Sequence, residues 1–235
     1  MPVEIERAMI LAAGRGTRMR SLTDELPKPL IKVKDRPLID RIVDKIVAFG
    51  ITQGVVNVCY LGDMIKADLS KRADISLTFS EEEEALETGG GVKKALPLLG
   101  EKPFFVINSD PLWTEVRPSL ADMAQSFDET EDDILLLLWP KERVFGHDGK
   151  CDYYLENGRP RRRRPEEESA PYVYAGAQIL HPRIFDDAPD GKFSLKLLYD
   201  KAEKAGRLAA VIGVGDWYHV GTPEALALAE QRLKE

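Results

Sequence analysis

Cysteine and long apolar runs are both scarce in this chain of 235 residues. Its two cysteines, Cys59 and Cys151, are too few for a disulfide framework and lack the spacing and histidine companions of a zinc site. Apolar stretches such as residues 134–139 fall far short of the roughly 20 residues that a membrane helix needs. The first residues also lack the basic region of a signal peptide. We therefore expect a cytoplasmic protein with no membrane partner.

An excess of basic charge is absent as well. The 40 acidic and 33 basic residues give a formal net charge of −7, which argues against a nucleic-acid partner. This balance still permits a local basic pocket for one phosphorylated ligand. With 43% hydrophobic and 31% charged residues, the composition is that of a globular protein and excludes collagen-like, low-complexity and wholly disordered chains.

Short apolar runs alternate with segments of helical spacing in the first half of the chain. The pattern predicts strands at residues 8–12, 55–58, 75–79 and 104–107. Helices are predicted at residues 37–49, at 63–69 and, after a triple glycine, at 92–99. Such alternation implies right-handed crossovers and a mostly parallel sheet with helices on both faces. The fold class is therefore α/β, of a Rossmann-like kind.

The second half changes character after a predicted helix at residues 119–127 and a buried strand at 134–139. Turn residues become frequent, and Asn157-Gly158 is a favoured two-residue hairpin turn. A strand at 172–180, a helix at 195–205, a strand at 208–214 and a helix at 223–233 complete the pattern. The chain shows no repeat and no linker. We predict one domain, residues 1–235, with a mixed sheet and a small β-rich insertion.

Three loops should meet at one edge of this sheet, because ligands of open α/β sheets bind at the carboxyl ends of parallel strands. These loops comprise residues 11–29, 86–91 and 108–110. Met19 stands where a dinucleotide fingerprint requires glycine, and no Walker motif is present. Small residues, the Arg18 guanidinium and Lys28, held between two prolines, nevertheless form a pattern suited to phosphate.

The same residues resemble a known family. Residues 11–18, LAAGRGTR, followed by PKP at 27–29, are similar to the signature of the sugar-1-phosphate nucleotidyltransferases. Within that family, LETGGG at 86–91 looks most like the branch that transfers uridylyl groups to N-acetylmuramate 1-phosphate. The resemblance implies the nucleotide-diphospho-sugar transferase fold, with the β-rich insertion near the sugar.

The resemblance also implies roles for single residues. The nucleoside triphosphate would be bound by residues of all three loops: Ala12, Ala13, Gly14, Gly16, Thr17, Arg18, Lys28, Thr88, Gly89 and Asn108. Arg18 and Lys28 would be catalytic. The sugar would face Glu87, Asp152 and Gly176. Asp110 and His219 would hold Mg²⁺ or, alternatively, Mn²⁺.

The chemistry of such a transfer suits these residues. The attacking oxygen belongs to a sugar phosphate that is already ionised at neutral pH, so no general base is needed. Positioning and charge neutralisation remain, and cations supply both. Magnesium takes one or two carboxylates plus substrate phosphates, which suits a single aspartate at a strand end.

One position departs from the family pattern. The family usually carries a second metal carboxylate in a Trp-x-Asp-x-Gly-Thr segment, where this chain has His219. Imidazole suits magnesium poorly and manganese or zinc better. Three alternatives stay open: the metal preference shifts, Asp216 substitutes, or His219 contacts phosphate.

The leading hypothesis for function is transfer of a uridylyl group from UTP to N-acetylmuramate 1-phosphate, in peptidoglycan recycling. The alternatives are a mannose-1-phosphate guanylyltransferase, more distantly a choline-phosphate cytidylyltransferase, or a catalytically silent nucleotide-binding subunit, which His219 would allow. Residues 161–164 either meet the lactyl carboxylate of the sugar or form a solvated loop. Residues 81–84 are expected to form an exposed face, with the alternative that the loop they begin edges the nucleobase pocket. The base, the sugar, the number of metal ions and the oligomeric state stay open.

Overall fold

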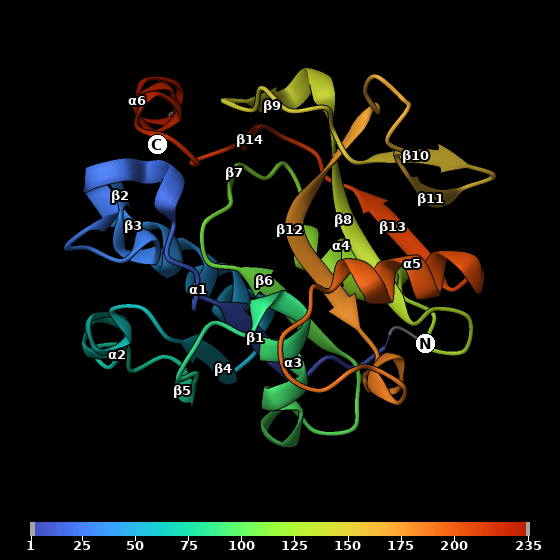
Figure 1. Ribbon diagram of the computed structural model, residues 1–235, viewed down its shortest axis with the longest axis horizontal. Coiled ribbons are helices and arrows are strands. Elements are labelled where there is room, and N and C mark those ends of the chain that lie inside the picture. The colour runs from blue at the N-terminus through green and yellow to red at the C-terminus, as the bar shows by residue number, and fades with distance from the viewer. Residues whose placement is uncertain (1–2, 234–235) are drawn as a thin grey trace.

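A nine-stranded sheet runs through the computed structural model, which describes residues 3–233 without the side chain of Arg20 (Figure 1). One half consists of four parallel strands in the order β5 (Ser76–Glu81), β4 (Gln53–Val58), β1 (Ala8–Leu11) and β6 (Phe104–Asn108). The carboxyl ends of these strands therefore lie at one edge of the sheet.

The other half of the sheet is mixed. Here β12 (Tyr172–Leu180) pairs antiparallel with β6 and with β8 (Ile134–Pro140), and β13 (Leu208–Ile212) is parallel to β8. The hairpin of β10 (Tyr153–Glu156) and β11 (Arg159–Arg162) joins the start of β12. This hairpin turns at Asn157 and Gly158, both with positive φ, as the sequence predicts.

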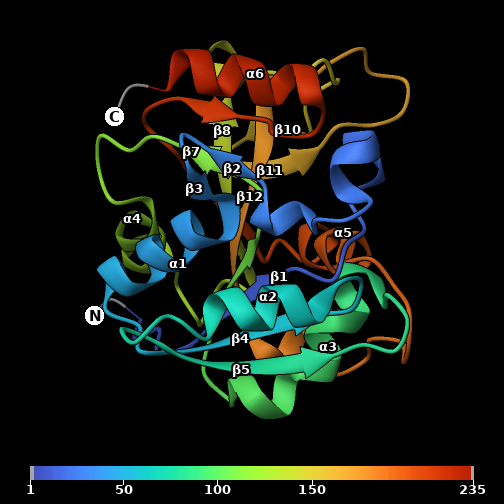
Figure 2. The ribbon, with the colours of Figure 1, turned by 90° about the vertical axis from the view of Figure 1, so that its left-hand side faces the viewer.

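Helices cover both faces of the sheet, which is seen edge-on in Figure 2. One face packs against α1 (Leu38–Phe49), α2 (Gly62–Leu69) and α4 (Ser119–Ser126), and the other against α3 (Glu87–Leu99) and α5 (Lys196–Lys204). Successive strand residues alternate between the two apolar clusters: Ile10 faces one and Met9 the other. Because both faces are buried, the strands read as continuous apolar runs.

A third apolar cluster joins the two ends of the chain. Here α6 (Pro223–Arg232) packs near η1, a 3-10 helix at Thr17–Thr23, with Met19 and Ala229 both buried in the cluster. Short elements surround it: β2 (Lys32–Val33) and β3 (Arg36–Pro37), and a small sheet of β7 (Leu112–Trp113), β14 (Trp217–Tyr218) and β9 (Val144–Phe145). Three more 3-10 turns are η2 (Lys28–Leu30), η3 (Lys141–Arg143) and η4 (Pro182–Phe185).

The α/β class, the mixed sheet and the helices on both faces are confirmed. The triple glycine differs from expectation, because α3 begins at Glu87 and therefore includes it. A side chain at Gly89 or Gly90 would collide with Phe193 or with the backbone of Gly191. The glycines thus allow α3 to lie close to a neighbouring segment. Within residues 3–233, the longest and most apolar helices still fall short of what a membrane crossing requires.

Candidate active site

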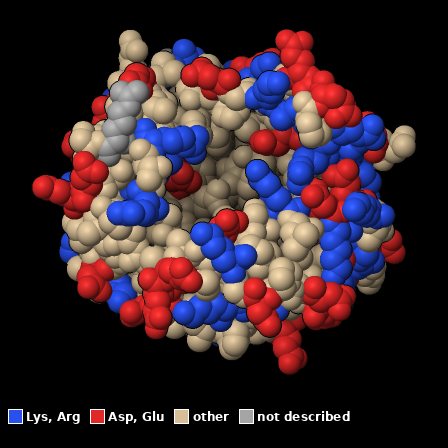
Figure 3. All heavy atoms as spheres, in the orientation of Figure 1, with Lys and Arg blue, Asp and Glu red and all other residues tan. Residues whose placement is uncertain are grey.

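A cavity of about 370 Å³ opens at the carboxyl ends of β1, β4 and β6, on the face that is hollowed in Figure 3. Its size is within the range of small-molecule sites. The loops after β1, β5 and β6 all contribute to its wall, as the strand order predicts. The lining residues are Leu11, Ala13, Gly14, Gly16, Thr17, Arg18, Lys28, Pro29, Asn57, Glu82, Ala85, Glu87, Thr88, Asn108, Ser109, Asp110 and Gly221.

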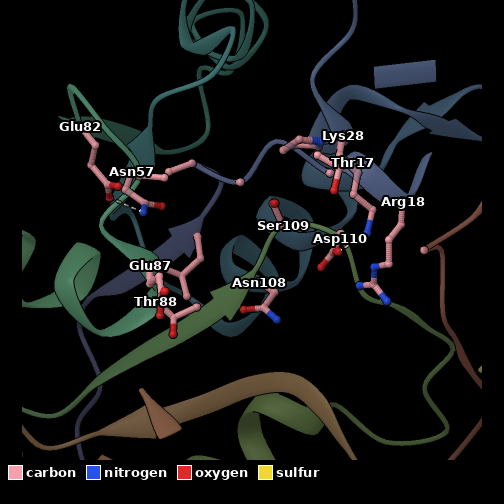
Figure 4. A pocket seen from close by; sticks show the side chains of 17 residues that line it. Thr17, Arg18, Lys28, Asn57, Glu82, Glu87, Thr88, Asn108, Ser109 and Asp110 are labelled. Carbon is pink, nitrogen blue, oxygen red and sulfur yellow. Dashed lines mark hydrogen bonds and ion pairs between the residues drawn. The ribbon is translucent and has the colours of Figure 1, made fainter. Parts of the chain in front are cut away.

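Positive charge gathers at one end of the cavity, where Arg18, Lys28 and Asp110 lie near one another (Figure 4). The Lys28 ammonium forms an ion pair with the Asp110 carboxylate, and their side chains are 9% and 32% exposed. Pro27 is extended before Lys28, and Pro29 follows it in η2. Prolines on both sides favour an extended backbone at Lys28, but Lys28 instead begins the 3-10 turn η2. Its side chain nevertheless lines the cavity, with Pro27 fixing the chain before the turn and Pro29 fixing φ within it.

Gly16 fixes the glycine-rich loop against this lysine. Its φ is +66°, and an added Cβ would lie 2.8 Å from the Cβ of Lys28. No other residue type fits here without strain in the backbone and displacement of the lysine. The loop and the cation are therefore positioned together.

Replacing Gly16 with alanine is expected to lower the free energy of unfolding by about 1–3 kcal/mol, because alanine is strained at this φ and overlaps Lys28. Gly14→Ala is the matched control, since an added Cβ there meets nothing within 4 Å. It should change stability by no more than about 0.5 kcal/mol. Urea denaturation of both variants measures the difference, and equal stabilities would contradict the close approach of loop and lysine.

The other end of the cavity carries Asn57, Glu82, Glu87, Thr88 and Asn108 (Figure 4). Glu82 is only 5% exposed, so the expectation that residues 81–84 form an exposed face is wrong at this position. Glu81, Glu83 and Glu84 are exposed as expected. Glu82 differs because its carboxylate accepts hydrogen bonds from the Asn57 side chain and the Leu86 N–H, 2.7 and 2.8 Å away.

Some of the predicted binding residues lie outside the lining. Ala12 lies behind the wall, where its N–H donates to Asn57 at 2.8 Å, and Gly89 is buried in α3 with its N–H on the Phe193 carbonyl. Asp152 accepts a hydrogen bond from the Tyr174 N–H at 2.9 Å. None of these three residues lines the cavity, and the hydrogen bond of each is to a group within the protein.

Gly176 likewise lies behind the wall. It has a φ of +84° at an irregularity in β12, and an added Cβ would lie 3.2 Å from the side-chain nitrogen of Asn108. This glycine therefore lets β12 close against the strand that carries the cavity residue Asn108. Its effect on the cavity is exerted through Asn108.

Seven residues line the cavity but were not among the predicted site residues: Leu11, Pro29, Asn57, Glu82, Ala85, Ser109 and Gly221. A lone polar residue in the apolar run of β4 was the signal for Asn57, because a buried strand carries an amide only where it has partners. Glu82 is one of four consecutive glutamates, so nothing distinguished it from its neighbours. Only the place of their loop, at the edge of the expected nucleobase pocket, pointed to the cavity.

His219 lies next to the cationic end of the cavity. Its ring stacks on Trp217, with centroids 5.8 Å apart, and meets His147 edge-on at 5.4 Å. Burial, followed by the nearby charges of Lys28, His147 and Arg18, lowers the pKa of His219 to about 4. The imidazole is therefore neutral at pH 7.

The side chains around Asp110 can hold magnesium only if substrate phosphates and water supply the remaining ligands. Across residues 3–233, no three His, Cys, Asp or Glu side chains gather as a ready-made metal centre. Asp216 forms an ion pair with Arg143 at 2.6 Å, so its carboxylate is already engaged. Asp110 remains as a carboxylate in the cavity beside the cations. Magnesium commonly takes one or two carboxylates and completes its shell with substrate phosphates and water, which this donor set allows.

The depressed pKa of His219 predicts a pH effect on stability. Between pH 6.5 and about 4, His219 binds a proton in the unfolded chain but not in the folded protein. The free energy of unfolding should therefore fall as the pH drops through this window. Because the ring is only partly buried, we expect a loss on the order of 1 kcal/mol. Urea denaturation in chelator at pH 7 and 4.5 measures it. Between pH 7 and 4.5, His219→Asn should lose less stability than the wild type. Equal losses would show that the pH effect does not come from His219.

The arginine stretch is engaged within the protein. Arg161 pairs with Glu156 and Glu167 at 2.6 and 2.8 Å. Arg162 pairs with Asp200 at 2.6 Å. These guanidinium groups stabilise the β10–β11 hairpin and its surroundings, which favours a structural role over contact with a substrate carboxylate.

Comparison with known proteins agrees with the fold and the site. The profile of the nucleotidyl transferase family matches residues 7–146. This chain therefore belongs to the nucleotidyl transferase family.

Individual relatives cover nearly the whole chain. It is 42% identical to the N-acetylmuramate alpha-1-phosphate uridylyltransferase of Caulobacter vibrioides, covering 97% of both chains. A protein of the same name from Neisseria meningitidis is 34% identical over 95% of this chain and 98% of its own. The mannose-1-phosphate guanyltransferase beta-B of Xenopus laevis is 29% identical, over 93% of this chain and 62% of its own length. Among solved structures, a putative glucose-1-phosphate thymidylyltransferase from Bacillus anthracis shares the fold, with a TM-score of 0.78, 20% identity and 97% of each chain covered.

Proposed function

We propose that this protein transfers a uridylyl group from UTP to N-acetylmuramate 1-phosphate and releases pyrophosphate. The observation that carries the reaction class is the cavity in which Arg18 and Lys28 lie beside Asp110 under a glycine-rich loop. The choice of UTP and N-acetylmuramate 1-phosphate is supported by the relative of that name, which is 42% identical at full length. The guanyltransferase relative is less similar and longer, which makes guanylyl transfer the second choice.

The cavity suits an in-line displacement at phosphorus. A phosphate oxygen of the sugar phosphate attacks the α-phosphorus of UTP, forming one P–O bond while the bond to the pyrophosphate oxygen breaks. The attacking oxygen is already ionised, so no proton needs to be removed. The described lining of the cavity accordingly contains neither histidine nor cysteine.

Cationic groups do the remaining work. Arg18 and Lys28 hold the anionic phosphates together and stabilise charge that develops on the leaving pyrophosphate. Asp110 would hold a divalent ion, which when bound neutralises phosphate charge and polarises the α-phosphate. We propose Mg²⁺ for this ion, with Mn²⁺ as the alternative because a neutral imidazole, His219, lies nearby.

The polar end of the cavity is proposed to bind uncharged parts of the substrates. Thr88 and Asn108 offer hydrogen-bonding groups there, and Glu87 offers a carboxylate that accepts bonds from hydroxyl or amide N–H donors. Glu87 has a φ of +59°, a conformation that costs a non-glycine residue on the order of 1 kcal/mol. That cost favours a functional reason for a side chain at this position. We assign Glu87 to the sugar half of the site. Gly176 shapes this half through Asn108, and Asp152, outside the cavity wall, supports it from the insertion side through the Tyr174 N–H.

The setting of the reaction follows from its substrate. UTP is an intracellular nucleotide and N-acetylmuramate is a cell-wall sugar, so we propose a cytoplasmic role in peptidoglycan recycling. A catalytically silent nucleotide-binding subunit is the third candidate, and the observation that favours it is the neutral His219 where the family usually carries aspartate.

Pyrophosphate release tests the proposal. UTP, GTP and CTP are each combined with the 1-phosphates of N-acetylmuramate, mannose and glucose, in Mg²⁺ and then in Mn²⁺. We expect the highest kcat/KM with UTP and N-acetylmuramate 1-phosphate. A preference for GTP with mannose 1-phosphate would establish the guanylyltransferase alternative. Nucleotide binding without turnover in any combination would establish the silent subunit.

A further inference from the structure

Two buried polar side chains connect neighbouring loops at one end of the cavity. Asn57 lies in β4 and is 3% exposed, and Glu82 directly follows β5 and is 5% exposed. The Asn57 amide nitrogen donates to Glu82 Oε1 at 2.7 Å. Both residues line the cavity at its end away from Lys28 (Figure 4).

Each side chain also bonds to the backbone of a different loop. Asn57 Oδ1 accepts the Ala12 N–H at 2.8 Å, in the glycine-rich loop after β1. Glu82 Oε2 accepts the Leu86 N–H at 2.8 Å, just before α3. The three hydrogen bonds form a continuous relay from Ala12 through Asn57 and Glu82 to Leu86. The relay therefore ties the loop after β1 to the segment before α3 and sets their separation at this end of the cavity.

The surrounding structure makes room for this relay. An added Cβ at Gly91 of α3 would lie 2.7 Å from Glu82 Oε1 and 2.8 Å from the Asn57 amide nitrogen. The third glycine of the LETGGG segment thus lets α3 approach the relay closely. A buried carboxylate is costly unless its oxygens are hydrogen-bonded, and here both oxygens accept uncharged donors. The carboxylate of Glu82 is therefore satisfied by its hydrogen bonds, and Gly91 leaves the space that these bonds need.

We propose that Asn57 and Glu82 are positioning residues for the nucleotide: their relay holds the glycine-rich loop and the segment before α3 at the spacing that nucleotide binding requires. The inference rests on the proposed function only in that a nucleoside triphosphate occupies this cavity. It is independent of which sugar is used.

Each single substitution breaks the relay at one point. Glu82→Gln offers one oxygen for two donors, so either Asn57 or the Leu86 N–H loses its acceptor. Asn57→Asp places a second carboxylate against that of Glu82, and the donor between them is lost. We expect each single variant to bind nucleotide about tenfold more weakly than the wild type, a change of about 1.4 kcal/mol.

The double variant Asn57→Asp with Glu82→Gln restores the relay with one direction reversed. The new carboxylate at position 57 accepts from the Ala12 N–H and from the new amide at position 82, whose oxygen accepts the Leu86 N–H. All three hydrogen bonds and the net charge return. We expect nucleotide affinity within about threefold of the wild type, a recovery that two independent sites would not show.

Titration calorimetry with nucleotide alone, without sugar phosphate, measures the affinities. The probe is whichever of UTP, GTP or CTP the wild type binds most tightly. Glu84→Gln is the matched control, because it removes the same charge from an exposed position of the same segment and should leave affinity unchanged. Melting temperatures accompany each titration. If a single variant does not fold, wild-type-like affinity of the double variant still supports the relay.

The relay is overturned if the single variants bind nucleotide as tightly as the wild type, or if the double variant is at least tenfold weaker than the wild type. These results leave the proposed function standing as long as the wild type turns over its substrates. A wild type that binds no nucleotide would instead overturn both. The KM for sugar phosphate adds a second readout, which we expect to change less than twofold in the single variants.

Discussion

Lys28→Ala is expected to lower kcat by about 10²–10³-fold, the usual cost of removing one preorganised charge that stabilises a transition state. Lys28 is the buried cation at the phosphate end of the cavity, and its direction is fixed by the flanking prolines and the close approach of Gly16. The fold should persist, because Asp110, its partner, is one-third exposed and water can solvate the carboxylate left behind. Pyrophosphate release and a thermal melt measure the two effects.

Lys32→Ala is the control for this experiment, because it removes the same charge from an exposed site four residues away. It should leave turnover near the wild-type value. Near-normal turnover in Lys28→Ala would refute the catalytic role of this lysine. Lys28→Arg should restore little, since the planar guanidinium cannot replace a compact ammonium in a closely packed site.

Asp110→Asn is expected to reduce metal-dependent turnover by at least about 10²-fold, because the substitution removes the anionic ligand while keeping the shape of the side chain. The Mg²⁺ concentration for half-maximal rate should also rise more than tenfold. Asp110 lies two residues after the end of β6, where it contacts Lys28, so the variant frees the lysine from its ion pair as well. Nucleotide affinity without metal should therefore stay the same or improve.

Metal titrations of the rate, together with nucleotide titrations in chelator, separate these two effects. Asp63→Asn serves as the control, because its carboxylate is 97% exposed on α2 and lies outside the cavity. An Asp110→Asn variant whose Mg²⁺ dependence matches the wild type would exclude this aspartate as the metal ligand. The ion would then have to be held by substrate phosphates with other side chains.

The sequence predicts most of the regular structure because both faces of the sheet are buried. Buried strands appear as apolar runs, and α1 is marked by Pro37 at its start and Gly50, with positive φ, at its end. The strand at Tyr172–Leu180 was predicted with both bounds correct. Two-residue strands such as β7 and β14 could not be predicted, because they are too short for any periodicity and form through contacts distant in the chain.

The candidate site was predictable to the extent that it depends on local motifs. The glycine-rich loop, Lys28 and Asp110 are marked by residue type and by their place after a strand, and they do share a cavity. The buried state of Glu82 could not be predicted, since it depends on Asn57, 25 residues earlier, and on the missing side chain of Gly91 in α3. Whether the predicted binding residues act as assigned stays a prediction for the variants above.

The packing of α6 near η1 affects how the protein matures during translation. Met19, only three residues beyond Gly16, is buried in the same cluster as Ala229. The central strands can pair as soon as β6 has emerged from the ribosome, but the apolar cluster that buries Met19 beside the glycine-rich loop is complete only when α6 is added. A nascent chain halted before α6 would therefore have its parallel strands in place and still bind nucleotide more weakly than the full chain.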